Sequence, residues 1–361
     1  CLHGPHVRAA DYKAWTYGYT TRLDQLVRAD RSLHDLARVR LPADFRPPAP
    51  AAAGEDDPVQ AWPDLHSTVT LMQRQSNGLS DLLQRLDTAE QRMRRLLDSQ
   101  PDRSLFMLTQ MLQDPQVGYC AAHALASAAA SLLVARALLI GDEEQRALLR
   151  AALTMNIGIS RFMDDLRLPS GDITPAQLRA VQEHPLRGML LLHRLGVTDP
   201  LWLELVRDHH EMPDGSGYPA GKHLQQALPQ NLLRLADIMF EHIGLGREPG
   251  GSTPLSTAPA RRLLLDDQGR PNPLGAAFLR TLGLYLPGTF VQLASGETAI
   301  VVRRGAKATT PRVLTLVNRQ GLPLGEPVSR DCAEPGCEVV AAVPAQAVKV
   351  LVSPGKLLAR A

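Results

Sequence analysis

The segment HHEMPDGSGYP, from His209 to Pro219, holds residue types that can bind a metal ion and an anion side by side. Its two adjacent histidines offer imidazole nitrogens, which are common ligands of divalent metals. On a helix end these side chains point about 100° apart, so both reach one metal cluster only at its edge. The residues that follow must form a tight loop, because glycine allows positive φ and proline fixes the exit. Backbone N–H groups of such a loop can approach an anionic ligand.

The segment resembles the HHExxDGxGYP motif of the HD-GYP family, and the resemblance extends over roughly 103–352. It implies a helical phosphohydrolase domain that holds two or three metal ions, usually iron or manganese. Cyclic di-GMP, the bacterial second messenger, or a related cyclic dinucleotide would be the ligand. Arg247 resembles a phosphate-contacting arginine of the family. The loop residues predicted to meet ligand or partner are Asp214, Gly215, Ser216, Gly217, Tyr218 and Pro219.

The same resemblance implies metal ligands from several helices. His123 and Asp237 would belong to one metal site, and His184, His209 and His210 to another. Each of the first group has a plainer interpretation: His123 as a hydrogen-bonded core residue, and Asp237 as the partner of a histidine or arginine. His184 precedes a proline and can equally be a helix cap.

A departure from the family pattern lies between these ligands. The segment Leu153–Ile159 reads LTMNIGI where the family carries a pattern such as LLHDIGK, so Met155 replaces the histidine, Asn156 the aspartate and Ile159 the lysine. The amide of asparagine is neutral and bridges two cations poorly, and a thioether is a soft ligand for such ions. Tyr119 also stands where some members carry a glutamate ligand. The remaining ligands favour one ion, or none, over two.

These departures leave three functions open. The sequence favours a degenerate phosphodiesterase that binds cyclic di-GMP, or a protein partner through its loop, with weak or no turnover. The second is an active metal-dependent cyclic di-GMP phosphodiesterase with a rebuilt centre. The third is another metal-dependent phosphohydrolase that uses a mononuclear site.

The fold is predicted to be mainly α, an HD-type helical bundle with a small C-terminal β extension. Leu- and Ala-rich segments predict helices over 103–113, 119–140, 143–157, 175–195, 199–210 and 229–245. Short β-branched runs predict strands over 290–293, 298–303, 313–317, 339–343 and 347–352. The predicted parts are 1–63, an N-terminal helical segment with a Pro/Ala-rich linker; 64–100, a long coiled-coil-like helix; 101–287, the HD-GYP-like domain; and 288–361, the β-rich extension.

A heptad pattern runs through the helix predicted over 64–99. Its apolar positions are Leu65, Met72, Leu79, Leu82, Leu86, Ala89, Met93 and Leu96. Such a seam is typical of a coiled coil that forms a homodimer, and an amphipathic helix packed on its own domain gives the same pattern.

Composition excludes little, but the cysteine pattern favours a cytoplasmic protein, and the family resemblance implies a bacterial one. The formal net charge is +2, from 39 basic and 37 acidic residues, which calls for no nucleic-acid partner. No run of about 18 apolar residues occurs, so no membrane span is expected. The four cysteines include no CxxC pair and are expected to be reduced thiols.

Overall fold

The computed structural model describes residues 56–75, 81–166, 174–221, 228–245, 263–265, 269–350 and 353–360. The chain divides into two compact units after Asp56, and the helices and strands described belong to the second unit. The predicted N-terminal segment up to residue 55 therefore lies outside the described residues, as does Arg247. The Pro/Ala-rich linker was predicted to reach residue 63, but helix α2 (Pro58–Gln75) begins earlier. Pro58 fits there because the first turn of a helix has no partner for its N–H groups.

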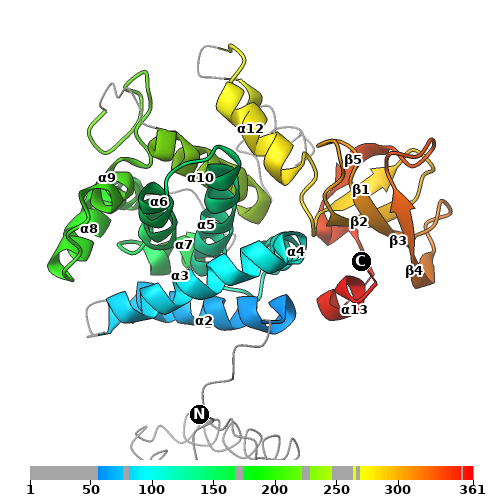
Figure 1. The fold of residues 1–361 in the computed structure, drawn as a ribbon, viewed down its shortest axis with the longest axis horizontal. Helices are drawn as coiled ribbons and strands as arrows, with labels where there is room; N and C mark the ends of the chain where they lie inside the picture. The colour runs from blue at the N-terminus through cyan, green and yellow to red at the C-terminus, as the bar shows by residue number, and fades with distance from the viewer. Residues whose placement is uncertain are drawn as a thin grey trace, which may run out of the picture. The chain divides into compact units, whose positions relative to one another are not determined.

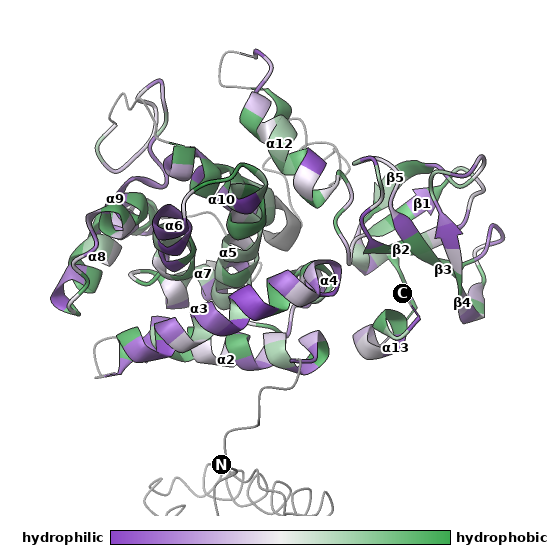
Figure 2. Cartoon of the chain, viewed as in Figure 1, coloured by the Kyte–Doolittle hydropathy of each residue, from purple (hydrophilic) through white to green (hydrophobic). Residues whose placement is uncertain are grey.

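The single long helix predicted over 64–99 was wrong. Two helices occupy this part of the chain, α2 and α3 (Leu82–Ser99), and Figure 1 shows them side by side. The described heptad residues are buried in the chain's own core: Leu65, Met72, Leu82, Leu86, Ala89, Met93 and Leu96. In Figure 2 both helices alternate between hydrophobic and hydrophilic residues along their length, as amphipathic helices do. The described part of the apolar seam is thus covered by the chain's own core and is not free to pair with a second copy, whereas the homodimer itself stays a prediction.

The helices that follow form the mainly α domain, so the predicted fold class is confirmed. They are α4 (Pro101–Gln113), α5 (Tyr119–Ala137), α6 (Asp142–Thr154), α7 (Ser160–Leu166), α8 (Pro175–Arg194), α9 (Pro200–Asp208), α10 (Leu228–Leu245) and α12 (Pro273–Leu282). α5 lies among the others and contacts α4, α6, α10 and α12. Its many alanines let those helices approach closely, because each occupies little volume between two backbones.

α5 is also long and apolar enough to cross a membrane by length and composition alone. In the best window, 83% of its residues are buried inside the protein. A helix that is apolar on every side is equally typical of a protein core, and the burial indicates that role here.

Two helix starts set the position of histidine-bearing elements. The Thr174 hydroxyl accepts a hydrogen bond from the Gln177 N–H, and the Gln177 side chain accepts one from the Thr174 N–H, which completes a capping box at α8. The Asp199 carboxylate accepts hydrogen bonds from the N–H groups of Leu201 and Trp202 at the start of α9. In the sequence, the Thr174-Pro175 and Asp199-Pro200 pairs are typical of an N-cap followed by proline at the first helical position, and the structure confirms both helix starts.

The C-terminal extension is an antiparallel sheet of five strands in the order β4-β3-β2-β1-β5. Its strands are β1 (Phe290–Leu293), β2 (Thr298–Arg303), β3 (Arg312–Val317), β4 (Pro323–Asp331) and β5 (Val339–Val343). β4 was not predicted, because its proline, glycine and charged residues hide a partly exposed edge strand. The strand predicted over 347–352 was wrong in its described part, where a 3₁₀ turn, Ala345–Ala347, is followed by irregular chain. A short helix, α13 (Pro354–Leu358), follows.

Specific contacts join this extension to the helices. Alternate residues of β2 and β3, such as Ile300 and Leu314, belong to the same apolar core as the helical domain. The Arg304 Nε lies 2.5 Å from the Asp102 carboxylate of α4. The Gln110 side chain donates a hydrogen bond of 2.6 Å to the Gly288 carbonyl.

Candidate metal centre

Three histidines meet where α8 and α9 pack together. His184 lies on α8, and His209 and His210 follow directly after α9. One ring nitrogen from each histidine lies within 4.8 Å of the others. The His184 and His209 side chains are buried, whereas the His210 side chain keeps 23% of its surface exposed. His210 is therefore the member of the cluster through which the site reaches solvent.

The orientation of two of these imidazoles is fixed by backbone carbonyls. The His184 Nδ1 lies 2.5 Å from the Val181 carbonyl, and the His209 Nδ1 lies 2.8 Å from the Val206 carbonyl. Each Nδ1 must donate its proton there, so each Nε2 carries a lone pair. The two Nε2 atoms face one another at 3.2 Å. Two lone pairs at this distance repel, and a shared cation would turn the repulsion into coordination.

A second group adjoins the three histidines. The Asp237 carboxyl, on α10, lies 3.6 Å from His210 Nδ1 and 3.5 Å from His123 Nε2. The His123 Nε2 also lies 3.3 Å from the Asp237 backbone carbonyl, and its buried Nδ1 has no hydrogen-bond partner among the described residues. Asp237 thus connects the buried His123 of α5 to the histidine cluster, so the residues assigned to two metal sites form one continuous group.

Burial keeps the histidines neutral and disfavours the charged carboxylate. It lowers the pKa of both His123 and His184 to about 4. The pKa values of His209 and His210 also lie well below the usual value, because of burial and then the neighbouring imidazoles. Burial, aided by the charge of Glu241, raises the pKa of Asp237 well above its usual value. Neutral imidazoles are the form that binds a metal ion, and a cation would favour the ionised carboxylate.

The loop after the histidines is tightly closed. The Asp214 carboxylate accepts hydrogen bonds from the Ser216 N–H and hydroxyl, at 3.0 and 2.7 Å. Gly215 has a φ of 77°. A Cβ on Gly217 would lie 2.4 Å from the His210 carbonyl oxygen, so only glycine fits against the histidine backbone.

The loop returns to the histidines through its tyrosine. The Tyr218 N–H donates to the His210 carbonyl at 3.2 Å, and the centroids of the Tyr218 and His210 rings lie 4.6 Å apart. The bond to Pro219 is cis. The Tyr218 ring therefore lies beside the exposed edge of the cluster, where a ligand would arrive.

Sequence reasoning missed the residues that hold this loop and these histidines. Glu211 is completely buried, and its carboxylate accepts a hydrogen bond of 2.7 Å from the Ala220 N–H beyond the loop. The Gln230 side chain of α10 donates to the Asp208 carbonyl, next to His209. The HHE pattern signals the glutamate, whereas a glutamine within an apolar helix carries no signal of its own.

The 155–159 turn, where the sequence differs from the family pattern, lies against α8. Met155, Asn156 and Ile159 are buried in the turn between α6 and α7. A Cβ on Gly158 would lie 3.3 Å from the His184 carbonyl oxygen, which places the turn directly on the helix that carries this histidine. Neither thioether nor amide supplies the bridging charge that two adjacent cations need.

The cluster fits one divalent cation. Ligand atoms about 2.1 Å from one tetrahedral ion lie about 3.4 Å apart, close to the spacing of the His184 and His209 nitrogens. Carbonyl groups already orient two of the ligands, as outer-shell partners do in metal sites. Asp237 adjoins the third ligand, His210. The described residues therefore offer a three-imidazole site with one carboxylate beside it.

Comparisons with known proteins define the class and then the family. Residues 79–250 match the family model described as "HD domain". The chain is 28% identical over 197 residues to "Cyclic di-GMP phosphodiesterase PA4108" of Pseudomonas aeruginosa, covering 54% of this chain and 47% of that protein. It is 31% identical over 146 residues to "3'3'-cGAMP-specific phosphodiesterase 3" of Vibrio cholerae, covering 40% of this chain and 31% of that protein. The chain thus spans about half or less of the length of these relatives.

Among solved structures, the chain resembles Bd1817, a HDG"Y"P protein from Bdellovibrio bacteriovorus, with a TM-score of 0.47 and 17% sequence identity. The match covers 63% of this chain and 72% of that one. The class is therefore an HD domain, by the family model and the helical fold that holds the histidines. Within that class, the loop motif and the two phosphodiesterase relatives identify the helical domain as a member of the HD-GYP family.

Proposed function

We propose that this chain is a degenerate HD-GYP protein of bacterial cyclic di-GMP signalling, which binds a cyclic dinucleotide or a protein partner with weak or no turnover. One observation carries the proposal: the histidine cluster and its loop are complete, whereas the adjoining turn holds Met155 and Asn156 in place of the His-Asp pair. A bacterial cytoplasmic location belongs to the same proposal.

The physical reason lies in the charge of the site. A cation held by His184, His209 and His210 would polarise a phosphate oxygen, which is the chemistry that iron or manganese would supply there. A second cation nearby needs an anionic bridge, and Asn156 is neutral. Without that bridge the site retains the means to bind a phosphate but lacks the paired ions of a two-metal hydrolysis.

Tyr218 and the loop backbone give the proposed ligand a second contact. The Tyr218 ring lies beside His210, the exposed ligand of the cluster. An aromatic face next to a phosphate-binding ion suits a nucleotide, because a base can stack on the ring while its phosphate meets the ion. The same exposed loop is the surface through which a protein partner would dock.

The alternative function is an active phosphodiesterase, or another phosphohydrolase, that works with one ion. The complete set of three imidazoles favours it, since such a set leaves a coordination position open for water or substrate. The degenerate and the active cyclic di-GMP phosphodiesterase differ in turnover and not in ligand, so cyclic di-GMP hydrolysis separates these two.

The experiment compares the chain with a variant in which the family residues are restored, Met155→His/Asn156→Asp/Ile159→Lys. Cyclic di-GMP hydrolysis is measured with iron or manganese under reducing conditions, and His209→Ala in each background is the control. We expect binding with little product from the unmodified chain, and a gain of turnover in the restored variant that His209→Ala abolishes. Turnover by the unmodified chain that depends on His209 would establish the alternative instead.

A further inference from the structure

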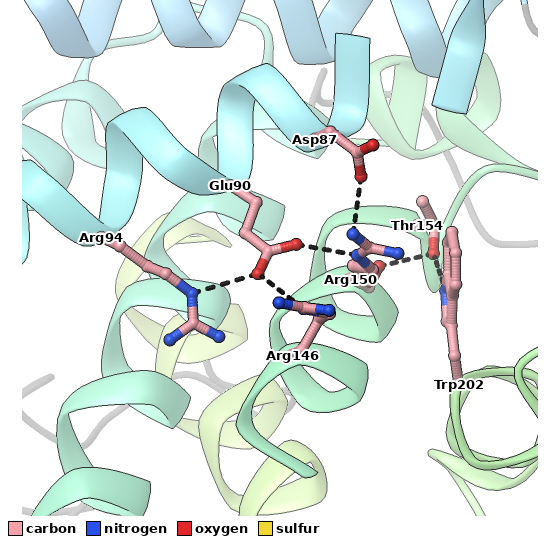
Figure 3. A network of polar contacts seen from close by, with 7 residues as sticks. All are labelled: Asp87, Glu90, Arg94, Arg146, Arg150, Thr154 and Trp202. Carbon is pink, nitrogen blue, oxygen red and sulfur yellow. Dashed lines mark hydrogen bonds and ion pairs between the residues drawn. The ribbon is translucent and has the colours of Figure 1, made fainter. Parts of the chain in front are cut away.

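A network of polar side chains lies away from the metal centre, between α3, α6 and α9 (Figure 3). Its first member is Glu90 of α3, whose side chain is only 5% exposed. The Glu90 carboxylate lies 2.8 Å from Arg150 Nε, 3.1 Å from Arg94 Nε and 3.6 Å from Arg146 Nε. The negative charge of this carboxylate is balanced by the three arginines. Because Arg146 and Arg150 belong to α6, these contacts also fix the position of α6 along α3.

Arg150 continues the network from α3 toward α9. While its Nε contacts Glu90, its Nη2 lies 2.6 Å from the Asp87 carboxylate. Two carboxylates of α3 therefore fix the guanidinium group. Its central carbon lies 5.6 Å from the centre of the Trp202 ring, within the range of a cation–π contact. The side chain therefore bridges α3 and the indole of α9.

One hydrogen bond then joins α9 to α6. The Thr154 hydroxyl donates to the Arg150 carbonyl at 2.7 Å, which leaves its lone pairs free to accept. The Trp202 Nε1–H donates to that oxygen at 2.9 Å. Trp202 is only 2% exposed, and breaking the bond would leave a buried N–H without a partner.

The place of this bond in the chain gives it a consequence for the metal centre. Thr154 is the last residue of α6 and directly precedes Met155 and Asn156. Trp202 lies on α9, about two turns before His209 and His210. The bond thus joins the helix that leads into the 155–159 turn to the helix that ends at the His209–His210 pair.

We propose that Arg150, Thr154 and Trp202 are positioning residues that set the His209–His210 pair relative to the 155–159 turn, and that Asp87 and Glu90 make this position depend on α3. The inference rests on the proposed metal centre for its functional meaning. Stability alone accounts poorly for the network, because replacing a buried ion pair by apolar residues is often neutral or stabilising.

The first test titrates the full chain with cobalt(II) and follows its absorption bands, which report both affinity and geometry. Thr154→Val removes the acceptor at constant shape, and Thr154→Ser keeps it. Trp202→Phe removes the donor, and Trp62→Phe is the matched control, because Trp62 is also fully buried but its Nε1 has no partner among the described residues. We expect Thr154→Val and Trp202→Phe each to weaken cobalt binding about tenfold, at the low end of outer-shell effects. Thr154→Ser and Trp62→Phe should bind as the unmodified chain does.

Combining the two changes sharpens this test. Because both remove the same bond, Thr154→Val/Trp202→Phe should weaken cobalt binding no more than either change alone. Asp87→Asn, at the exposed α3 end, should weaken it in the same direction by about threefold, since Arg150 keeps its contact with Glu90. Equal affinity for Trp202→Phe and Trp62→Phe would overturn the proposal.

Hydrogen exchange gives a readout that does not depend on a metal. We expect backbone amides of α9 and of the 155–159 turn to exchange faster in Thr154→Val and Trp202→Phe than in Thr154→Ser and Trp62→Phe. If the unmodified chain bound no cobalt, the proposed metal centre would fail, and exchange would still decide the positioning role. Unchanged exchange at both segments would overturn that role by itself.

Discussion

The polar side chains on the two sides of the candidate metal centre differ in their hydrogen-bond partners. On the α8–α9 side, His184 and His209 are held by backbone carbonyls, and their free nitrogens face one another at 3.2 Å. On the α5–α10 side, His123 has a buried nitrogen without a partner among the described residues, and burial raises the pKa of the Asp237 carboxyl. Histidine ligands oriented by carbonyls are prepared for a cation. On the second side, by contrast, one imidazole nitrogen has no partner among the described residues, and burial disfavours the charged form of the carboxyl.

The contrast indicates which contacts of the centre are independent of Met155 and Asn156. Met155 and Asn156 fill space in a buried turn and leave the α8–α9 side untouched, because its histidines take their orientation from their own helices. A second cation would need an anionic bridge, which the neutral amide of Asn156 cannot supply. In the proposed function, the missing bridge would prevent two-metal chemistry, while the three imidazoles could still hold one ion.

The largest expected difference between the two sides is in cation affinity. His209→Ala removes an oriented ligand, and we expect manganese or iron binding to fall by more than the roughly 100-fold that an outer-shell change costs at most. His123→Ala removes a histidine of equal burial from the other side and should weaken binding by less than about tenfold. Titration calorimetry on protein purified without chelators checks both, and equal losses would show that the two sides form one ligand set.

Cation binding should also stabilise the fold through one side only. At a free manganese concentration about 100 times the dissociation constant, we expect the free energy of unfolding to rise by about 2.7 kcal/mol. His184→Ala should abolish this gain, because it removes an oriented imidazole, while His123→Ala should keep most of it. Thermal unfolding with and without chelator measures the gain. A gain that survives His184→Ala would place the ion elsewhere.

The loop offers a smaller effect that sharpens the same comparison. Gly217→Ala forces a Cβ against the His210 backbone, and we expect it to destabilise the protein by about 2 kcal/mol and to weaken cation binding. Gly325→Ala, in the exposed part of β4 with no atom within 4 Å of the added Cβ, should stay within about 0.5 kcal/mol of the unmodified chain. Denaturant unfolding compares the two variants. If Gly217→Ala were as mild as its control, the loop would be less closely fitted to the histidines than its contacts indicate.

The sequence predicted the helices that bear the site because their caps and apolar spacing are local signals. Thr174-Pro175 and Asp199-Pro200 mark the starts of α8 and α9 in the chain itself, and the structure confirms both. The long helix over 64–99 was wrong for the converse reason. A heptad pattern states that one face is buried and leaves open whether the partner is another chain or, as here, the chain's own core.

The residue types of the site could be predicted from the sequence, but the contacts that orient those residues could not. Adjacent histidines and a glycine-rich loop are visible in the sequence, whereas the Val181 and Val206 carbonyls that orient two imidazoles have no side-chain signature. The bond between Thr154 and Trp202 joins residues far apart in the chain, and neither residue type indicates a partner by itself. Strand β4 was not predicted for a related reason: its pairing with β3, and not its own composition, makes it a strand.

The smallest expected effect concerns Asp237, the residue that joins the two sides. Burial raises the pKa of the Asp237 carboxyl and so disfavours its charged form, and asparagine is its closest neutral counterpart. We expect Asp237→Asn to change the free energy of unfolding without metal by less than about 1 kcal/mol.

The corresponding change from carboxylate to amide at Glu90 is the control, because the charge of that carboxylate is paired with three arginines. Glu90→Gln should cost about 2 kcal/mol, as expected when hydrogen bonds between charged groups are lost. With manganese present, Asp237→Asn should reduce the gain in stability only slightly if the three imidazoles carry the ion. A loss of the whole gain would make Asp237 a ligand equal to the histidines, and the division of the centre into a complete and an incomplete side would no longer hold.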